Sequence, residues 1–376
     1  MKKILFILLL ANVLSCKDDY NLPVSIPATG YLVIDGSINS GIGETVIALS
    51  KTVRLTDSFN VNYVTNAAVT LEGQDNSKIQ LNHRGNGQYV HNQLALNRSQ
   101  QYRLRILENG KEYVSGYLPV RQSPVIDSIS WEYDQSGVHI FMDAKGNTNT
   151  SGYYRYEYAE TWEFHAAYAP NLKYDLAPSA VYIERNQNSD YSKFTCYQGS
   201  RSTSIEILST AKIARDTTHY RLLTVPRRDW RISVLYSVEA TQTAISKEGF
   251  EYLSKMKRNT EQSGSIFDAQ PSELRGNITC VTNPAEPVIG FLEIADVYKK
   301  RIFIKNSQVP GWAFAHDCVL QNLVNKPDSI KNAGMPPPVM PATTDQLNNI
   351  LYFYYTQLSC VDCSQRGTLT KPSFWP

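Results

Sequence analysis

The chain lacks the motifs that mark the common classes of enzyme. It has no Gly-x-Ser-x-Gly nucleophile elbow, no His-Glu-x-x-His zinc motif and no phosphate-binding loop. Only six histidines are scattered along the 376 residues, and a Ser-His-Asp arrangement has no local support around them. We therefore expect a protein that is not an enzyme and that holds no cofactor and no metal ion.

The chain also lacks an excess of charge of either sign. The sequence contains 37 Lys and Arg residues against 35 Asp and Glu residues. Without a basic surplus there is no electrostatic reason to expect a nucleic-acid partner. The apolar segment Ile4–Ala11 is too short to span a bilayer, and no later apolar run is long enough to do so.

What is present begins with a segment typical of a lipoprotein signal peptide. Lys2 and Lys3 give a positive start, Ile4–Ala11 is the apolar part, and Val13–Ser15 followed by Cys16 has the form of a lipobox. We predict that residues 1–15 are removed and that Cys16 is acylated, each buried CH₂ adding about 0.8 kcal/mol of membrane affinity. The alternative is an ordinary signal peptide with an incidental cysteine.

Charged residues follow the acylated position. Lys17, Asp18 and Asp19 resemble the export signal that surface lipoproteins of the Bacteroidota carry beside the acylated cysteine. The resemblance implies an outer-membrane location facing the extracellular side. The alternative is that these three residues are only the solvated, charged start of a tether. We place this tether at residues 16–30, because the prolines and the glycine in this range follow no periodic pattern.

The remaining composition predicts a mainly β fold, since the chain has 24 Tyr and 12 Phe and is rich in β-branched residues. Residues 31–122 are predicted to form an N-terminal β-sandwich. Tyr102, Leu104 and Ile106 alternate with arginines, and Asn109-Gly110 suits a type I′ turn. The pattern resembles transthyretin-like and carboxypeptidase-regulatory β-sandwiches, modules that serve as spacers or docking units.

Residues 123–376 are predicted to form a second, elaborated β-sandwich with long loops, and the strands at its start resemble a fibronectin-like domain. One helix is expected over about 246–263. Ser246 suits its N-cap, and Phe250, Leu253 and Met256 recur at three-residue spacing on one face.

The segment 165–200 does not follow a strand pattern and is predicted to be a long loop. Its tyrosines are candidate binding residues because tyrosine offers apolar area, a hydroxyl and a small entropy cost: Tyr168, Tyr174, Tyr182 and Tyr191. The alternative is an insertion that only packs over the sheet.

Five cysteines remain after the acylated one, and export to an oxidising compartment favours disulfides. The candidates are Cys196, Cys280, Cys318, Cys360 and Cys363, an odd number that leaves at least one unpaired. The Cys-x-x-Cys spacing of the last two also permits half a zinc site or a redox pair.

Two sequence blocks carry a resemblance to a known family. The first runs from Gln262 through Cys280 to Gly290, and the second from Cys360 to Trp375. Together they resemble an uncharacterised family of Bacteroidota outer-membrane lipoproteins, a domain of unknown function encoded beside SusC-like TonB-dependent transporters. Ala269 and Thr279 depart from the Pro and His expected there. The first block contains candidate structural or docking residues: Asp268, Pro271, Glu273, Arg275 and Gly276.

The resemblance implies a surface-exposed lipoprotein that is an accessory to a TonB-dependent transporter in nutrient capture or uptake, with the outer membrane and the transporter as partners. No catalytic residues come with it, and it identifies no substrate. The alternatives are a surface adhesin or structural lipoprotein and a surface hydrolase of peptides or glycans.

Overall fold

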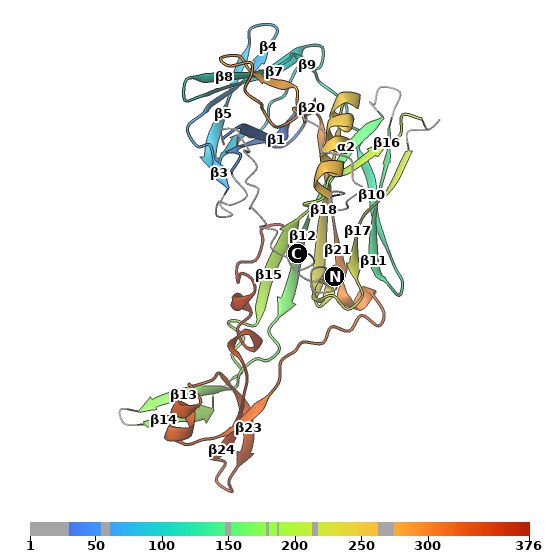
Figure 1. Cartoon of the computed structure of the whole chain (residues 1–376). Helices are drawn as coiled ribbons and strands as arrows, with labels where there is room; N and C mark the ends of the chain where they lie inside the picture. The colour runs from blue at the N-terminus through green and yellow to red at the C-terminus, as the bar shows by residue number, and fades with distance from the viewer. Residues whose placement is uncertain are drawn as a thin grey trace, which may run out of the picture.

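The computed structural model describes residues 30–53, 61–146, 152–177, 180–185, 188–212, 217–261 and 274–376. These residues form three tiers along one long axis (Figure 1). A curled sheet is the first tier, two facing sheets form the middle tier, and a small distal module lies at the opposite end. No helix in the described ranges is long and apolar enough to cross a membrane.

The first tier is one curled sheet of 11 strands in the order β19-β8-β7-β4-β5-β6-β2-β1-β20, with β3 beside β2 and β9 beside β7. Its N-terminal strands are β1 (Leu32–Asn39), β2 (Thr45–Lys51), β3 (Asn62–Tyr63), β4 (Ala68–Gly73), β5 (Lys78–Gly85), β6 (Gln88–His91), β7 (Gln101–Glu108), β8 (Lys111–Ser115) and β9 (Leu118–Pro119). The curl encloses one apolar core, so the predicted mainly β, sandwich-like fold is confirmed.

The predicted hairpin of β7 and β8 is present. Tyr102, Leu104 and Ile106 are buried in the core. Asn109 and Gly110 have φ values of 49° and 77°, which is the left-handed backbone that a type I′ turn requires. Period-two patterning therefore places the apolar side chains of this hairpin correctly.

A later segment of the chain returns to the first tier. β19 (Ile278–Cys280) pairs antiparallel with β8, and β20 (Ile294–Ala295) pairs parallel with β1. Between them, the backbone N–H of Ile34 donates to the carbonyl of Ile289 at 2.8 Å. The sheet that begins within residues 31–122 is thus completed by strands from beyond that boundary.

The middle tier consists of two sheets that face each other (Figure 1). One contains β10 (Ile126–Tyr133), β11 (Gly137–Lys145) and β17 (Thr217–Pro226); the other contains β15 (Thr195–Arg201), β12 (Tyr153–His165), β18 (Leu235–Ala244) and β21 (Val297–Lys305), with β16 (Glu206–Ser209) beside β12. Ile140 and Met142 from the first sheet share one core with Tyr154, Tyr156 and Val238 from the second.

Helix α2 (Lys247–Glu261) stands where the first and middle tiers meet (Figure 1). The hydroxyl oxygen of Ser246 accepts a hydrogen bond from the backbone N–H of Gly249 at 2.9 Å, so the predicted N-cap is confirmed. The described helix ends at Glu261, two residues short of the expected end, and residues 262–273 lie outside the described part of the chain.

The distal module joins two separate stretches of sequence. It contains the hairpin of β13 (Leu172–Ala177) and β14 (Ala180–Arg185), a sheet of β22 (Gln321–Val324), β24 (Ile350–Tyr355) and β23 (Pro338–Thr344), and helix α3 (Pro327–Asn332). Leu172, Ile183, Ile330 and Phe353 form its core.

The prediction of a long loop over 165–200 is therefore wrong, because β13, β14 and all but the last residue of β15 lie within it. Leu172 and Ile183 in this segment bury against Ile330 and Phe353, which lie far away in sequence. A core divided between two stretches leaves too few apolar residues in either one to produce a clear period.

Candidate functional site

A hollow lined largely by aromatic side chains lies where β12 runs out of the middle tier toward the distal module. Its volume is about 420 Å³, within the usual range of small-molecule sites. We call it the aromatic groove; its lining residues are Phe164, His165, Ala166, Ala167, Phe194, Trp230, Ser233, Val234, Asn306, Trp312, Ala313, Phe314, His316 and Arg366. They come from five stretches of the chain: the end of β12, the residue just before β15, the 3₁₀ helix η2 (Trp230–Ile232) with the residues after it, the region after β21, and the C-terminal segment.

The aromatic walls hold one another in place. Trp230 meets Phe164 edge-on with ring centroids 4.8 Å apart. The indole N–H of Trp312 donates to the carbonyl of Asp229 at 3.0 Å. Asn306, which opens the 3₁₀ helix η3 (Asn306–Gln308), donates from Nδ2 to the carbonyls of Ile232 and Trp312 at 2.8 and 3.2 Å. The groove is thus a preformed shape, as small-molecule sites usually are.

Arg366 is the one Lys or Arg among the lining residues, and these include no Asp or Glu. Its guanidinium carbon lies 5.4 Å from the ring centroid of Phe164 and 5.6 Å from that of Trp230. Its Nε is buried without a hydrogen-bond partner among the described residues. Such a donor is costly unless a partner arrives.

Two carboxylates close in sequence to groove residues are paired with other groups. Asp229 pairs with Arg231 at 2.9 Å, and Asp362 pairs with Lys193 at 2.7 Å. Burial raises the pKa of Asp362, but hydrogen bonds from Lys193 and Ser364 outweigh that effect and hold the pKa below its ordinary value. Both acids are paired with other cations, and neither of these two carboxylates pairs with the guanidinium in the groove.

Two disulfides frame the aromatic groove, so the prediction of structural disulfides is confirmed. Cys196 bonds to Cys363, and Cys318 bonds to Cys360, which lies in the 3₁₀ helix η4 (Leu358–Cys360). Each cysteine of the Cys-x-x-Cys pair therefore has a distant partner, which rules out a redox pair between them. Among the cysteines that the structure describes, Cys280 is the free thiol, buried in the first tier. Within the described ranges no group of three or more His, Cys, Asp or Glu residues is placed to hold a metal.

Gly367 fixes the turn that carries the guanidinium. This turn follows the 3₁₀ helix η5 (Cys363–Gln365). A Cβ atom at Gly367 would lie 2.6 Å from the carbonyl oxygen of Tyr197 and 2.8 Å from the ring of Phe164. The adjacent Thr368 exchanges two backbone hydrogen bonds with Tyr197, at 2.8 and 2.9 Å. The missing side chain lets the C-terminal segment lie directly on the floor of the groove.

The candidate tyrosines divide between the groove and the distal module. Tyr168 meets the ring of His316 edge-on at 5.6 Å, and Tyr191, exposed at the surface, meets Phe194 edge-on at 5.2 Å. Both therefore border the groove. Tyr174 packs in the distal module, where burial raises its pKa to about 12. Tyr182 lies on β14, and its side chain is outside the described structure.

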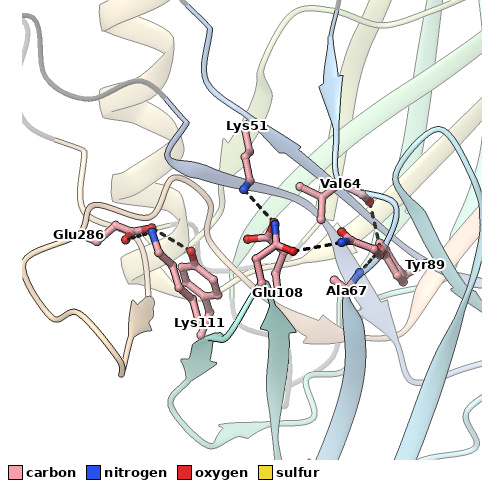
Figure 2. Close-up of polar contacts among 10 residues, drawn as sticks. Lys51, Val64, Ala67, Tyr89, Glu108, Lys111 and Glu286 are labelled. Atoms are coloured by element: carbon pink, nitrogen blue, oxygen red, sulfur yellow. Dashed lines mark hydrogen bonds and ion pairs between the residues drawn. The ribbon is translucent and has the colours of Figure 1, made fainter.

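The described part of the first family block has structural contacts. A Cβ atom at Gly276 would lie 1.7 Å from the carbonyl oxygen of Gly290, so the two backbones touch. Glu286 accepts hydrogen bonds from the ammonium of Lys111 at 2.5 Å and from the hydroxyl of Tyr113 at 2.8 Å (Figure 2). This block is thereby fastened to β8.

Several of the residues predicted for this block and for the N-terminus lie outside the described part of the chain. Asp268, Pro271 and Glu273 lie outside the described residues, as do Cys16 and the charged residues 17–19. Arg275 is described and makes contacts of its own.

A second hollow, of about 260 Å³, lies under α2 between β1 and β12. Arg155 lies 2.9 Å from Glu157 and 3.7 Å from Asp35. The buried carboxylate of Glu293 accepts a hydrogen bond from the backbone N–H of Ser246 at 2.8 Å. Because its charged groups pair with one another, we assign this hollow a structural role at the contact between the first and middle tiers.

Most of the groove was not anticipated from the sequence. Trp230, Trp312 and Arg366 are far apart in the chain, and no local pattern links them. The one available signal is the nearness of Phe194, His316 and Arg366 to cysteines at 196, 318 and 363. The disulfides bring these residues together in the fold, and their connectivity does not follow from the sequence.

Residues 17–301 match the family described as "Domain of unknown function (DUF4249)", a span that includes the first sequence block and ends before the second. No curated protein matches the chain. Among solved structures, the selenomethionine-substituted chicken interferon gamma receptor alpha chain matches 58% of this chain and 90% of its own length, with 8% identity and a TM-score of 0.14. A likeness this low carries no argument about fold or function. The family match covers most of the chain, which therefore belongs to the DUF4249 family.

Proposed function

We propose that this protein is a surface-exposed outer-membrane lipoprotein of the Bacteroidota. In this proposal it works without catalysis, as an accessory to a SusC-like TonB-dependent transporter in nutrient capture or uptake. The observation that carries the proposal is the aromatic groove. Its lining offers aromatic faces, two histidines and one guanidinium whose Nε has no acceptor among the described residues, and it includes no carboxylate. These are the features of a binding site.

The N-terminal sequence supports the membrane part of the proposal. An acylated Cys16 would hold the protein to the outer membrane, and Lys17, Asp18 and Asp19 would direct it to the outer leaflet. The tether of residues 16–30 then leads into the first tier, whose first strand begins at Leu32.

The distal module supports a protein partner. It exposes apolar side chains at Met340, Leu347, Leu351 and Tyr352, with Leu347 83% exposed. Leu351 and Tyr352 are neighbours on β24 and point to opposite faces of the strand, so the module offers apolar side chains on more than one side. Exposed apolar side chains are a feature of surfaces where another protein binds. The same surface favours the second candidate function, an adhesive or structural surface lipoprotein.

Extraction of the tagged protein from native outer membranes in a mild detergent, with mass spectrometry of copurifying proteins, tests the proposal. We expect a TonB-dependent transporter in stoichiometric amount. Leu347→Asp should reduce that yield, whereas Ile42→Asp, a matched change at an 88% exposed residue of the first tier, should not.

A protein recovered alone, from extracts in which other transporter complexes survive, would contradict the accessory role. Binding to glycan or matrix-protein arrays would then favour the adhesive function.

A further inference from the structure

We infer that the aromatic groove binds an organic carboxylate with a flat aromatic body, and that Arg366 anchors the carboxylate. The inference rests on the proposed capture role and names the class of substrate. Two sources share this chemistry: a free aromatic acid, and a short peptide whose C-terminal residue is aromatic.

The first argument is charge. Arg366 provides the only guanidinium or ammonium in the lining, and no carboxylate lies there to oppose it. Of the acids close in sequence to lining residues, Asp229 and Asp362 pair with Arg231 and Lys193, and Glu163 lies 3.5 Å from the lining residue His165 and accepts a hydrogen bond from Trp375. Asp317 directly follows the lining residue His316. An anion entering the groove therefore meets a cation that has no described partner to give up.

The second argument is hydrogen bonding. The Nε of Arg366 is buried and lacks an acceptor in the described structure. A guanidinium presents its N–H groups in a planar fork that matches the two oxygens of a carboxylate. Because this Nε has no exposed surface in the free protein, a carboxylate in the groove pairs first with the Nη groups of the fork and reaches Nε only when the side chain shifts toward it.

The third argument is the shape of the surroundings. Phe164 and Trp312 are buried at the floor, Trp230 is half-buried, and Phe314 is exposed at the rim. Aromatic rings pair by offset or edge-to-face contacts with other rings, and the hollow of about 420 Å³ holds a body of one or two rings. A ligand of this shape places its ring among the aromatic walls while its carboxylate reaches Arg366.

The single charge of the anchor selects the anion. A carboxylate carries one negative charge, whereas a phosphate monoester carries about 1.5 to 2 at neutral pH. One guanidinium balances the charge of a carboxylate, but it leaves part of the charge of a phosphate monoester uncompensated in a half-enclosed site. We therefore assign a carboxylate and not a phosphate.

Calorimetric titration of the full mature chain in detergent tests the inference with two acid–amide pairs. The first pair is indole-3-acetate and indole-3-acetamide; the second is the tripeptide Gly-Gly-Phe and its C-terminal amide. We expect the acid of at least one pair to bind about tenfold or more tighter than its amide, because only the acid satisfies the guanidinium. The pair that shows the preference identifies the source of the ligand.

Arg366→Gln should lower the affinity for the acid to that for the amide. Arg201→Gln, at an exposed position of β15 outside the groove lining, should leave both affinities unchanged. The acid-to-amide ratio of the unmodified chain tests the inference even where the variant fails to fold. Equal affinities within both pairs, or no binding of any of the four probes, would overturn it.

The outcome is separable from that of the proposed function. A chain that copurifies with a transporter but shows no preference for acids overturns the inference alone. A chain that prefers acids but has no transporter partner overturns the accessory role alone.

Discussion

Glu286 and Arg366 are charged residues in opposite situations. Glu286 accepts hydrogen bonds from Lys111 and Tyr113, so its charge is balanced within the fold (Figure 2). Arg366 has a buried Nε with no described acceptor. A satisfied buried charge holds two segments together, whereas an unsatisfied one destabilises the free protein and gains from a ligand. We therefore assign Glu286 a structural role in holding the first sequence block to β8, and Arg366 a role in ligand binding.

Replacing Glu286 with Gln should destabilise the protein by about 1–2 kcal/mol at neutral pH, because it removes a hydrogen-bonded ion pair whose carboxylate side is only 8% exposed, although Lys111 is 45% exposed. Burial raises the pKa of Glu286, but the hydrogen bonds from Lys111 and Tyr113 outweigh it and hold the pKa below its ordinary value of 4.5. A carboxyl with a depressed folded-state pKa contributes stability above its unfolded pKa and loses it as the pH falls through the folded-state pKa.

Urea unfolding between about pH 7 and about pH 3 measures this difference. The gap in free energy of unfolding between the unmodified chain and Glu286→Gln should be widest at neutral pH and narrow below about pH 4.5. Glu44→Gln, which breaks the more exposed ion pair with Arg84, should cost less than about 1 kcal/mol. A gap for Glu286→Gln that does not change with pH would show that the carboxylate charge is not what matters.

Gly276→Ala should also destabilise the fold, by about 1–3 kcal/mol or more, because the new methyl would meet the carbonyl oxygen of Gly290 at 1.7 Å. Gly116→Ala is the matched control, since no atom lies within 4 Å of its Cβ position. Thermal unfolding should show a lower Tm for the first variant only. Equal Tm values would mean that the two backbones separate at little cost.

At the scale of elements, short pieces of structure are held by ties to distant parts of the chain. The 3₁₀ helices η4 and η5 are three residues each, and each carries one cysteine of a disulfide. Elements this short have no stability of their own, because helix formation needs several turns before propagation outweighs nucleation. The C-terminal side of the groove therefore depends on covalent bonds and on its contacts with β15.

The double substitution Cys318→Ser with Cys360→Ser should lower the free energy of unfolding by about 2–4 kcal/mol, since the bond closes a loop with a sequence separation of 42. It should also weaken binding in the groove, because Cys318 lies two residues after His316. Urea unfolding and ligand titration measure the two effects.

The pairing itself is checked by alkylating the unreduced chain after unfolding. Of the five cysteines that follow Cys16, only Cys280 should be labelled. Label at Cys318 or Cys360 would contradict the pairing.

At the scale of the whole molecule, the sequence predicts what is local. Alternation identifies the β7–β8 hairpin, and Ser246 with its following apolar face identifies α2, because each signal lies within about a dozen residues. The completion of the first tier by β19 and β20, the distal module and the aromatic groove all join segments more than a hundred residues apart. No period or motif encodes such meetings, and only the folded chain reveals that Nε of Arg366 has no acceptor among the described residues.

The first tier needs strands β19 and β20, which come from a later part of the chain, to complete its core and its sheet edges. Ile278, Leu292 and Ile294 belong to its core, and β20 covers the edge of β1 while β19 covers the edge of β8. A fragment of residues 30–122 would expose this core and leave both edges open, which favours aggregation. We expect it to lack a cooperative thermal transition by circular dichroism. The same fragment joined by a flexible Gly-Ser linker to residues 274–296 should regain one. A short fragment that unfolds as cooperatively as the joined one would show that the first tier folds without its returning strands.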